Sequence, residues 1–205
     1  DDAPYYVRTH FMFCNGSCAG TQKFGSTNIY RELSDGSVIY DFTYYDLILD
    51  SILESGNKPF VELGFMPQHL ADPKYHEQPS LAGMDVYKEV GWTYPPEDYG
   101  KWHDFILTTA RHLAERYGAD EIATWYFELW NEPDICYWSG TVDEYCTLYD
   151  NTEHALHEAL PGARLSGPAC TGIFLHNGAN AFMKQFLRHC REGRNARTGQ
   201  TGTRL

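Results

Sequence analysis

The segment 130–134 reads Trp-Asn-Glu-Pro-Asp and places a carboxyl group beside an amide. The run before it, 125–129, is aromatic and aliphatic, and predicts a buried strand that stops at the proline. Glu132 would then lie at the carboxyl end of a strand, where it can act as a proton donor, and Asn131 beside it can bind a hydroxyl group. Hydrolysis of a glycosidic bond uses a carboxyl proton donor together with a second carboxylate, and hydrogen bonds to the sugar hydroxyls assist it.

The segments around this motif alternate between strand-like and helix-like patterns. Apolar runs predict strands at 5–11, 59–65, 125–130 and 163–168. Amphipathic patterns predict helices at 43–56, 95–118, 141–161 and around 182–190. Because strands alternate with helices, we expect βαβ units and a parallel sheet.

Local signals mark where several of these elements begin and end. Thr43 with Asp46, and Thr141 with Glu144, have the spacing of a helix capping box.

The segment 68–94 is a long loop, of a length typical of functional or mobile segments. The tail 191–205 is polar and Gly-rich, and we expect a polar linker or the start of a further unit there, after a folded region at 1–190.

The fold class follows from what the strand ends carry. Four βαβ units are too few to close an eight-stranded barrel, which takes about 250 residues, and a doubly wound sheet would also fit this length. No Gly-rich or Walker nucleotide-binding loop supports the doubly wound alternative. Arg8, His10, Phe65, Asn131 and Glu132 all fall near strand ends. That pattern favours an α/β fold that is part of a (β/α)8 TIM barrel.

Composition limits the partners that we expect. The 205 residues carry a formal net charge of −12, which disfavours nucleic acid, and no apolar run is long enough to span a membrane. No signal peptide is visible at the start, so we expect a soluble protein, cytoplasmic or secreted.

The cysteines and histidines form no local metal motif. Six cysteines match no zinc ribbon, and nine histidines include no HExxH pair, so we expect no metal and no cofactor. Cys14 and Cys18 flank a short loop, 15–17, in which a disulfide is geometrically possible, with buried thiols as the alternative.

Five segments together resemble glycoside hydrolase family 39, and the similarity extends over roughly residues 5–190. They are 8–10 (Arg-Thr-His), 62–67 (Glu-Leu-Gly-Phe-Met-Pro), 95–99 (Pro-Pro-Glu-Asp-Tyr), 115–118 (Glu-Arg-Tyr-Gly) and 125–134, which contains the motif above. The family includes β-xylosidases and α-L-iduronidases. The resemblance implies a (β/α)8 catalytic barrel and hydrolysis with retention of anomeric configuration.

The resemblance also implies a role for each strand-end residue. Glu132 would be the general acid/base, and Asn131 would bind the sugar 2-hydroxyl. His10 would line the same subsite, and Phe65 would lie beside the sugar. Arg8 would lie near the nucleophile.

The family's nucleophile is a second glutamate on its seventh strand, which this sequence does not reach. We therefore expect the chain to supply about half of a barrel, strands two to five, and to need a complementary C-terminal half. The leading prediction is a β-xylosidase-like retaining glycosidase with a carbohydrate substrate. The alternatives are α-L-iduronidase-like specificity, which would need a cationic clamp that is not evident here, and a catalytically silent carbohydrate-binding protein.

Each candidate residue has a structural alternative. Arg8 and His10 share one strand face, where Arg8 could instead form an ion pair with Glu62 or Glu128. Asn131 could satisfy a turn, and Glu132 could make only local hydrogen bonds. Two loop tryptophans could stack on a leaving sugar or simply pack; they are Trp92 and Trp138.

Overall fold

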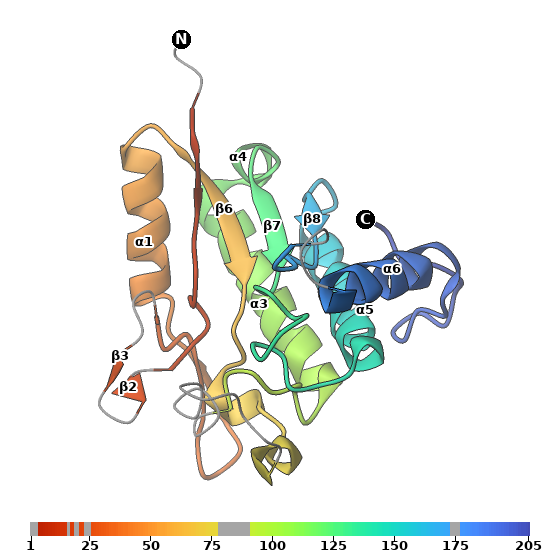
Figure 1. The fold of residues 1–205 in the computed structure, drawn as a ribbon. Coiled ribbons are helices and arrows are strands. Elements are labelled where there is room, and N and C mark those ends of the chain that lie inside the picture. Colours follow the sequence, from red (N-terminus) through yellow and green to blue (C-terminus); the bar gives the residue numbers. More distant parts are fainter. Residues whose placement is uncertain (1–3, 16, 19–20, 23–25, 78–90, 173–176) are drawn as a thin grey trace.

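The computed structural model describes residues 4–15, 17–18, 21–22, 26–77, 91–172 and 177–205. Its centre is a parallel four-stranded sheet in the order β1-β6-β7-β8 (Figure 1). The strands are β1 (Tyr6–Arg8), β6 (Lys58–Leu63), β7 (Tyr126–Leu129) and β8 (Leu165–Ser166). The predicted strands and the parallel α/β arrangement are therefore confirmed, although each strand is shorter than its apolar run.

Helices connect the strands, and in the view of Figure 1 they lie behind the sheet and at its two sides. The α-helices are α1 (Thr43–Glu54), α3 (Tyr99–Tyr117), α4 (Ala119–Ile122), α5 (Val142–Ala159) and α6 (Asn177–Glu192). Two 3-10 helices, η1 (Gln68–Leu70) and η2 (Pro73–Glu77), lie in the segment that was expected to be a long loop; its residues 78–90 fall outside the described part.

Two small antiparallel hairpins follow β1 and were not expected from the sequence. They are formed by β2 (Ser17–Cys18) with β3 (Thr21–Gln22), and by β4 (Tyr30–Glu32) with β5 (Val38–Tyr40). Gly36, with a positive φ of 82°, lies in the turn of the second hairpin. The Cys18 side chain is outside the described part, so a disulfide to Cys14 remains a prediction.

The two faces of the sheet differ in burial because side chains alternate along a strand. On one face, Val61, Leu63, Phe127 and Leu129 are at most 2% exposed and belong to the same apolar core as α3 and α5. The opposite face carries larger aromatic and charged side chains, many of them exposed; they are Tyr6, Arg8, Phe60, Glu62, Tyr126, Glu128 and Arg164. None of the helices in the described part of the chain covers that face in Figure 1.

One predicted helix cap is confirmed and the other is wrong. At α5, Thr141 Oγ1 accepts from the Glu144 N–H at 3.2 Å, and Glu144 Oε2 accepts from the Thr141 N–H at 2.8 Å. At α1 the cap residue is Phe42, and no side chain bonds to the cap. Asp46 points elsewhere because its carboxylate pairs with His112 Nε2 of α3 at 2.7 Å.

The polar segment after residue 191 is anchored to the helix layer in its first part. Helix α6 continues to Glu192, and the following loop folds back onto α5. The fully buried Asp150 accepts hydrogen bonds from the Ala196 N–H at 2.7 Å and from Thr203 Oγ1 at 2.5 Å. A buried carboxylate requires such partners, so the tail is attached to the helix layer even though most of its side chains are exposed.

Among the described residues, no helix is both long and apolar enough to cross a bilayer.

The 205-residue chain on its own is expected to self-associate, because the β1 edge and the face without helices expose strand backbone and apolar surface. Light scattering after size exclusion should show concentration-dependent association. Val7→Lys, on the exposed edge strand, should reduce it. Leu47→Lys, on the exposed side of α1, is the matched control and should not. A monodisperse monomer that melts cooperatively at every concentration would contradict this expectation.

Candidate active site

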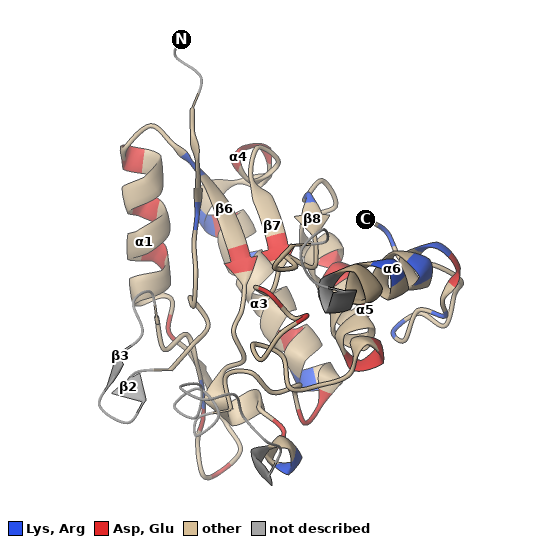
Figure 2. Cartoon of the chain, in the orientation of Figure 1, with Lys and Arg blue, Asp and Glu red and all other residues tan. Residues whose placement is uncertain are grey.

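Three neighbouring strands bring one cation against two carboxylates. Glu62 on β6 and Glu128 on β7 are register partners, so their side chains lie side by side on the face without helices. Arg8, at the end of β1, reaches both: its Nη2 is 3.2 Å from Glu62 Oε2 and 2.5 Å from Glu128 Oε2. Its Nε also donates to Glu128 Oε2 at 2.7 Å. Figure 2 shows acidic segments on β6 and β7 and a basic segment on β1. The predicted ion pair of Arg8 is confirmed with both glutamates.

Both carboxylates of this cluster are largely removed from solvent, which disfavours their charged forms. The side chain of Glu62 is 0% exposed and that of Glu128 is 13% exposed. Burial raises the pKa of Glu128 above its ordinary value and the adjacent Glu62 raises it further, while Arg8 opposes both effects. Two carboxylates therefore compete for one guanidinium, and the charge of the cluster depends on pH.

Arg8 also orients Asn131. Its Nη2 donates to Asn131 Oδ1 at 3.2 Å, so the amide oxygen is engaged by the cation. The Nδ2 group of Asn131 is then the part of the amide that can donate to a ligand. The side chain of Asn131 bonds to Arg8 rather than to a local turn.

The backbone on both sides of Asn131 adopts a conformation that is rare for these residue types. Trp130 has a φ of 71° and Glu132 a φ of 48°, each costing of order 1–3 kcal/mol. Two backbone bonds secure the segment: the Trp130 N–H donates to Leu63 O at 3.3 Å, and the Glu132 N–H donates to Ala169 O at 2.9 Å. Such strain persists only where the surroundings determine it, and it is frequent at functional sites. Glu132 is half-buried at the end of β7.

His10 and Phe65 occupy the same end of the sheet in different ways. His10 Nδ1 forms a short hydrogen bond with Glu62 Oε2, and its ring centroid lies 3.7 Å from that of Phe11. Phe65 is 0% exposed and lies 5.8 Å from His10, centroid to centroid. The ring of Phe65 has no exposed surface and packs against His10, and its place beside a sugar stays a prediction.

The structure thus brings Arg8 and His10 against Glu62, and Arg8 in turn bonds to Asn131. Glu132 directly follows Asn131 in the sequence. Glu62 and Glu128, which the sequence offers only as ion-pair partners of Arg8, are both members of this cluster. Each glutamate is the second-last residue of a mainly apolar strand, and this is the signal that the sequence offers. The two strands are neighbours in the sheet, which brings the two carboxylates together. One oxygen of the buried Glu62, Oε1, has no hydrogen-bond partner in the described part of the chain.

The two loop tryptophans pack rather than offer a stacking surface. Trp92 is 0% exposed and Trp138 is 5% exposed. The ring of Trp138 lies 5.1 Å from that of Trp130, and its Nε1 donates to Thr141 O at 2.9 Å. Neither ring is available to a leaving sugar in this structure, so the packing alternative is confirmed.

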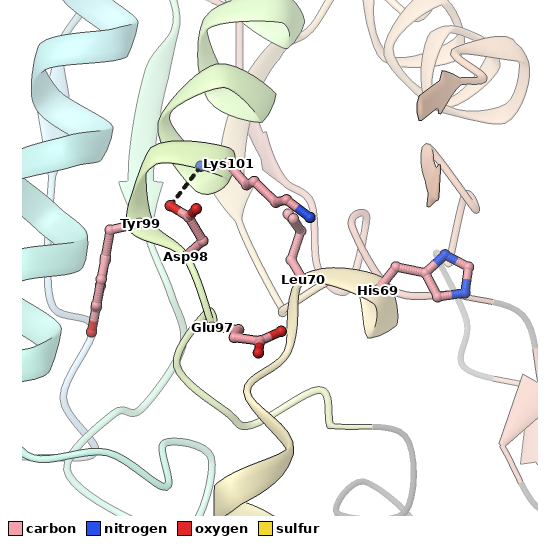
Figure 3. A pocket seen from close by; sticks show the side chains of 6 residues that line it. All are labelled: His69, Leu70, Glu97, Asp98, Tyr99 and Lys101. Carbon is pink, nitrogen blue, oxygen red and sulfur yellow. Dashed lines mark hydrogen bonds between the residues drawn. The ribbon is translucent and has the colours of Figure 1, made fainter. Parts of the chain in front are cut away.

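An open cavity of about 460 Å³ lies at the start of α3, away from these residues (Figure 3). It is lined by His69, Leu70, Glu97, Asp98, Tyr99 and Lys101. Two of its charged groups are already engaged: Asp98 caps α3 by accepting from the Gly100 N–H at 2.7 Å, and Lys101 Nζ is 3.0 Å from Glu32 Oε2. We therefore assign no chemistry to this cavity.

Comparison with known proteins places this geometry in a family. Residues 6–198 match the profile of "Glycosyl hydrolases family 39". The chain is 39% identical over 194 residues to a β-xylosidase of Geobacillus stearothermophilus, covering 92% of this chain and 34% of that protein. It is 32% identical over 204 residues to the α-L-iduronidase of Homo sapiens, covering 97% of this chain and 26% of that protein.

Among solved structures, a monomeric β-xylosidase from Caulobacter crescentus CB15 superimposes with a TM-score of 0.66 at 32% identity. The alignment covers 88% of this chain and 33% of that one. The chain therefore spans about a third of the length of the relatives that it matches.

The raised pKa of Glu128 predicts a pH-dependent stability difference. Over a window above the ordinary value of 4.5, the folded state retains a proton that the unfolded state has released. Stability contributed by this group is therefore lost as the pH rises through that window. Urea denaturation of the full-length protein should show wild type losing stability relative to Glu128→Gln as the pH rises.

Glu115→Gln, on the exposed side of α3, removes one carboxylate outside the cluster and serves as the control. The free energies of unfolding of wild type and Glu128→Gln are compared at each pH. A difference that stays constant with pH, or that shifts in favour of wild type as the pH rises, would contradict a raised pKa of Glu128 in the folded state.

Proposed function

The chain belongs to glycosyl hydrolases family 39, and from that premise we propose that the whole protein is a retaining glycosidase with Glu132 as its general acid/base. The observation that carries the proposal is the placement of Glu132 and Asn131 in a strained, doubly anchored segment at the carboxyl end of β7. Carboxyl ends of parallel strands are where barrel enzymes carry their catalytic groups.

In the proposed reaction, the carboxyl group of Glu132 protonates the departing glycosidic oxygen. A nucleophilic carboxylate about 5–5.5 Å away attacks the anomeric carbon and forms a glycosyl-enzyme. Glu132 then removes a proton from the water that hydrolyses this intermediate. We propose that the nucleophile, together with the polypeptide that completes the barrel around strands two to five, lies outside the present sequence.

Asn131 is proposed to donate from Nδ2 to the sugar 2-hydroxyl, an interaction that strengthens in the transition state. The contact between Arg8 and Asn131 Oδ1 supports this role because it fixes which end of the amide faces away from the cation. Glu62 and Glu128 act indirectly by positioning Arg8, and Glu62 also positions His10. Phe65 supports the ring of His10 from the apolar side.

The charge distribution favours a neutral sugar, as in a β-xylosidase. Arg8 is the cation in contact with this cluster, and it is already shared between two carboxylates. A uronic acid substrate, as in the α-L-iduronidase alternative, would need a further cation to bind its carboxylate. The higher identity to the Geobacillus β-xylosidase points the same way.

Glu132→Gln in the full-length protein should lower kcat/KM about 10²–10⁴-fold on aryl glycosides with poor leaving groups. The loss should be much smaller on activated leaving groups, because these depart without a proton. The control Glu115→Gln should match wild type on both. An equal loss on both substrate classes would contradict the acid role. Sugar binding without turnover in wild type would instead support the silent carbohydrate-binding alternative.

Asn131→Ala should lower kcat/KM for the natural glycoside by about 10²-fold or more, because it removes a transition-state hydrogen bond. The same variant should differ little from wild type on the 2-deoxy glycoside, which lacks the hydroxyl. A comparable loss on both substrates would show that Asn131 acts only through the structure of the segment.

A further inference from the structure

Two histidines meet between the helices that cover the buried side of the sheet. His103 on α3 is 2% exposed, and its Nε2 lies 3.0 Å from Nδ1 of the half-buried His154 on α5. The ring centroids are 5.1 Å apart and the ring planes are inclined by 46°, so the two nitrogens face each other without the rings stacking. Two imidazole nitrogens at this spacing either share one proton or bind one cation.

A carboxylate completes the group. Glu158 follows His154 by four residues on α5, which places both side chains on one helix face. The donor atoms of His103, His154 and Glu158 all lie within 4.8 Å of one another. Arg111 Nη2 donates to Glu158 Oε1 at 2.9 Å, which leaves the second oxygen of this exposed carboxylate available.

The buried histidine is oriented as metal-binding histidines usually are. His103 Nδ1 lies 3.1 Å from Asp104 Oδ1. In the tautomer with the proton on Nδ1, this N–H donates to the carboxylate and the lone pair of Nε2 faces His154. Metal-binding imidazoles generally donate their second ring N–H to a carboxylate or carbonyl in this way. Asp104 is therefore a positioning residue for the site.

We propose that His103, His154 and Glu158 form a Zn²⁺ site that joins α3 to α5. Zn–N bonds of about 2.0–2.1 Å place two nitrogens of a tetrahedral site about 3.3 Å apart, close to the observed 3.0 Å. Two imidazoles with one carboxylate suit zinc better than the oxygen-preferring magnesium or calcium, and a fourth position remains for water.

This site departs from the expectation of no metal, which rested on the absence of a local motif. His103 and His154 are 51 residues apart, so only the packing of α3 on α5 brings them together. The site lies in the helix layer and shares no residue with the Arg8 cluster. It therefore goes beyond the proposed glycosidase function, and zinc binding can be measured without any turnover.

The test is calorimetric titration of the full-length protein with Zn²⁺. Wild type should bind one equivalent that His154→Gln lacks, and Glu158→Gln should weaken that binding at least about tenfold. Asp104→Asn should weaken it by about 10–100-fold, as losses of an orienting carboxylate do. His69→Gln and Glu115→Gln, which change exposed residues outside the group, are matched controls and should bind as wild type does.

His154 and Glu158 are not fully buried, and circular dichroism should show that both variants keep the fold. Co²⁺ in place of Zn²⁺ should give the intense visible absorption of a tetrahedral site in wild type and lose it in His154→Gln. Equal Zn²⁺ stoichiometry and affinity in His154→Gln and His69→Gln would overturn the proposal and leave the pair as a hydrogen bond between helices.

Discussion

A single guanidinium shared by two carboxylates is the interaction on which the site depends. Glu62 has no exposed surface, and a buried carboxylate without a partner would be strongly destabilising, by about 3–5 kcal/mol when one partner of such a pair is removed. Arg8 meets that requirement, and in doing so it joins the ends of β1, β6 and β7 and bonds to Asn131. Arg8 neutralises the buried carboxylate of Glu62 on β6 and also bonds to the Asn131 amide after β7. The position of Asn131, next to Glu132, thus depends on this ion pair.

Much of the fold could be predicted because each element carries its own local signal. The apolar run before Pro133 and the capping box of Thr141 with Glu144 are both signals within a few residues. The failures occurred where a distant partner decided the outcome. Asp46, for example, binds His112 of another helix instead of capping its own.

For the site, the sequence predicted which residues gather at the strand ends but not how they share their contacts. Arg8, His10 and Asn131 converge there as expected, because parallel strands end at one edge of the sheet. The central position of Glu62 follows from β6 and β7 being neighbours in register, which local patterns do not specify. The burial of Phe65 follows from its packing against Phe11, Trp130 and Tyr137. The pairing of His103 with His154 has the same origin in helix packing.

The pH dependence of kcat/KM on an aryl glycoside with a poor leaving group, measured for the full-length protein and its Glu132→Gln variant, tests the central claim most directly. If Glu132 donates the proton, the wild-type rate falls at high pH as the donor deprotonates, and this basic limb disappears in the variant. A variant that keeps the wild-type basic limb would contradict the assignment, and the proton would have to come from another group.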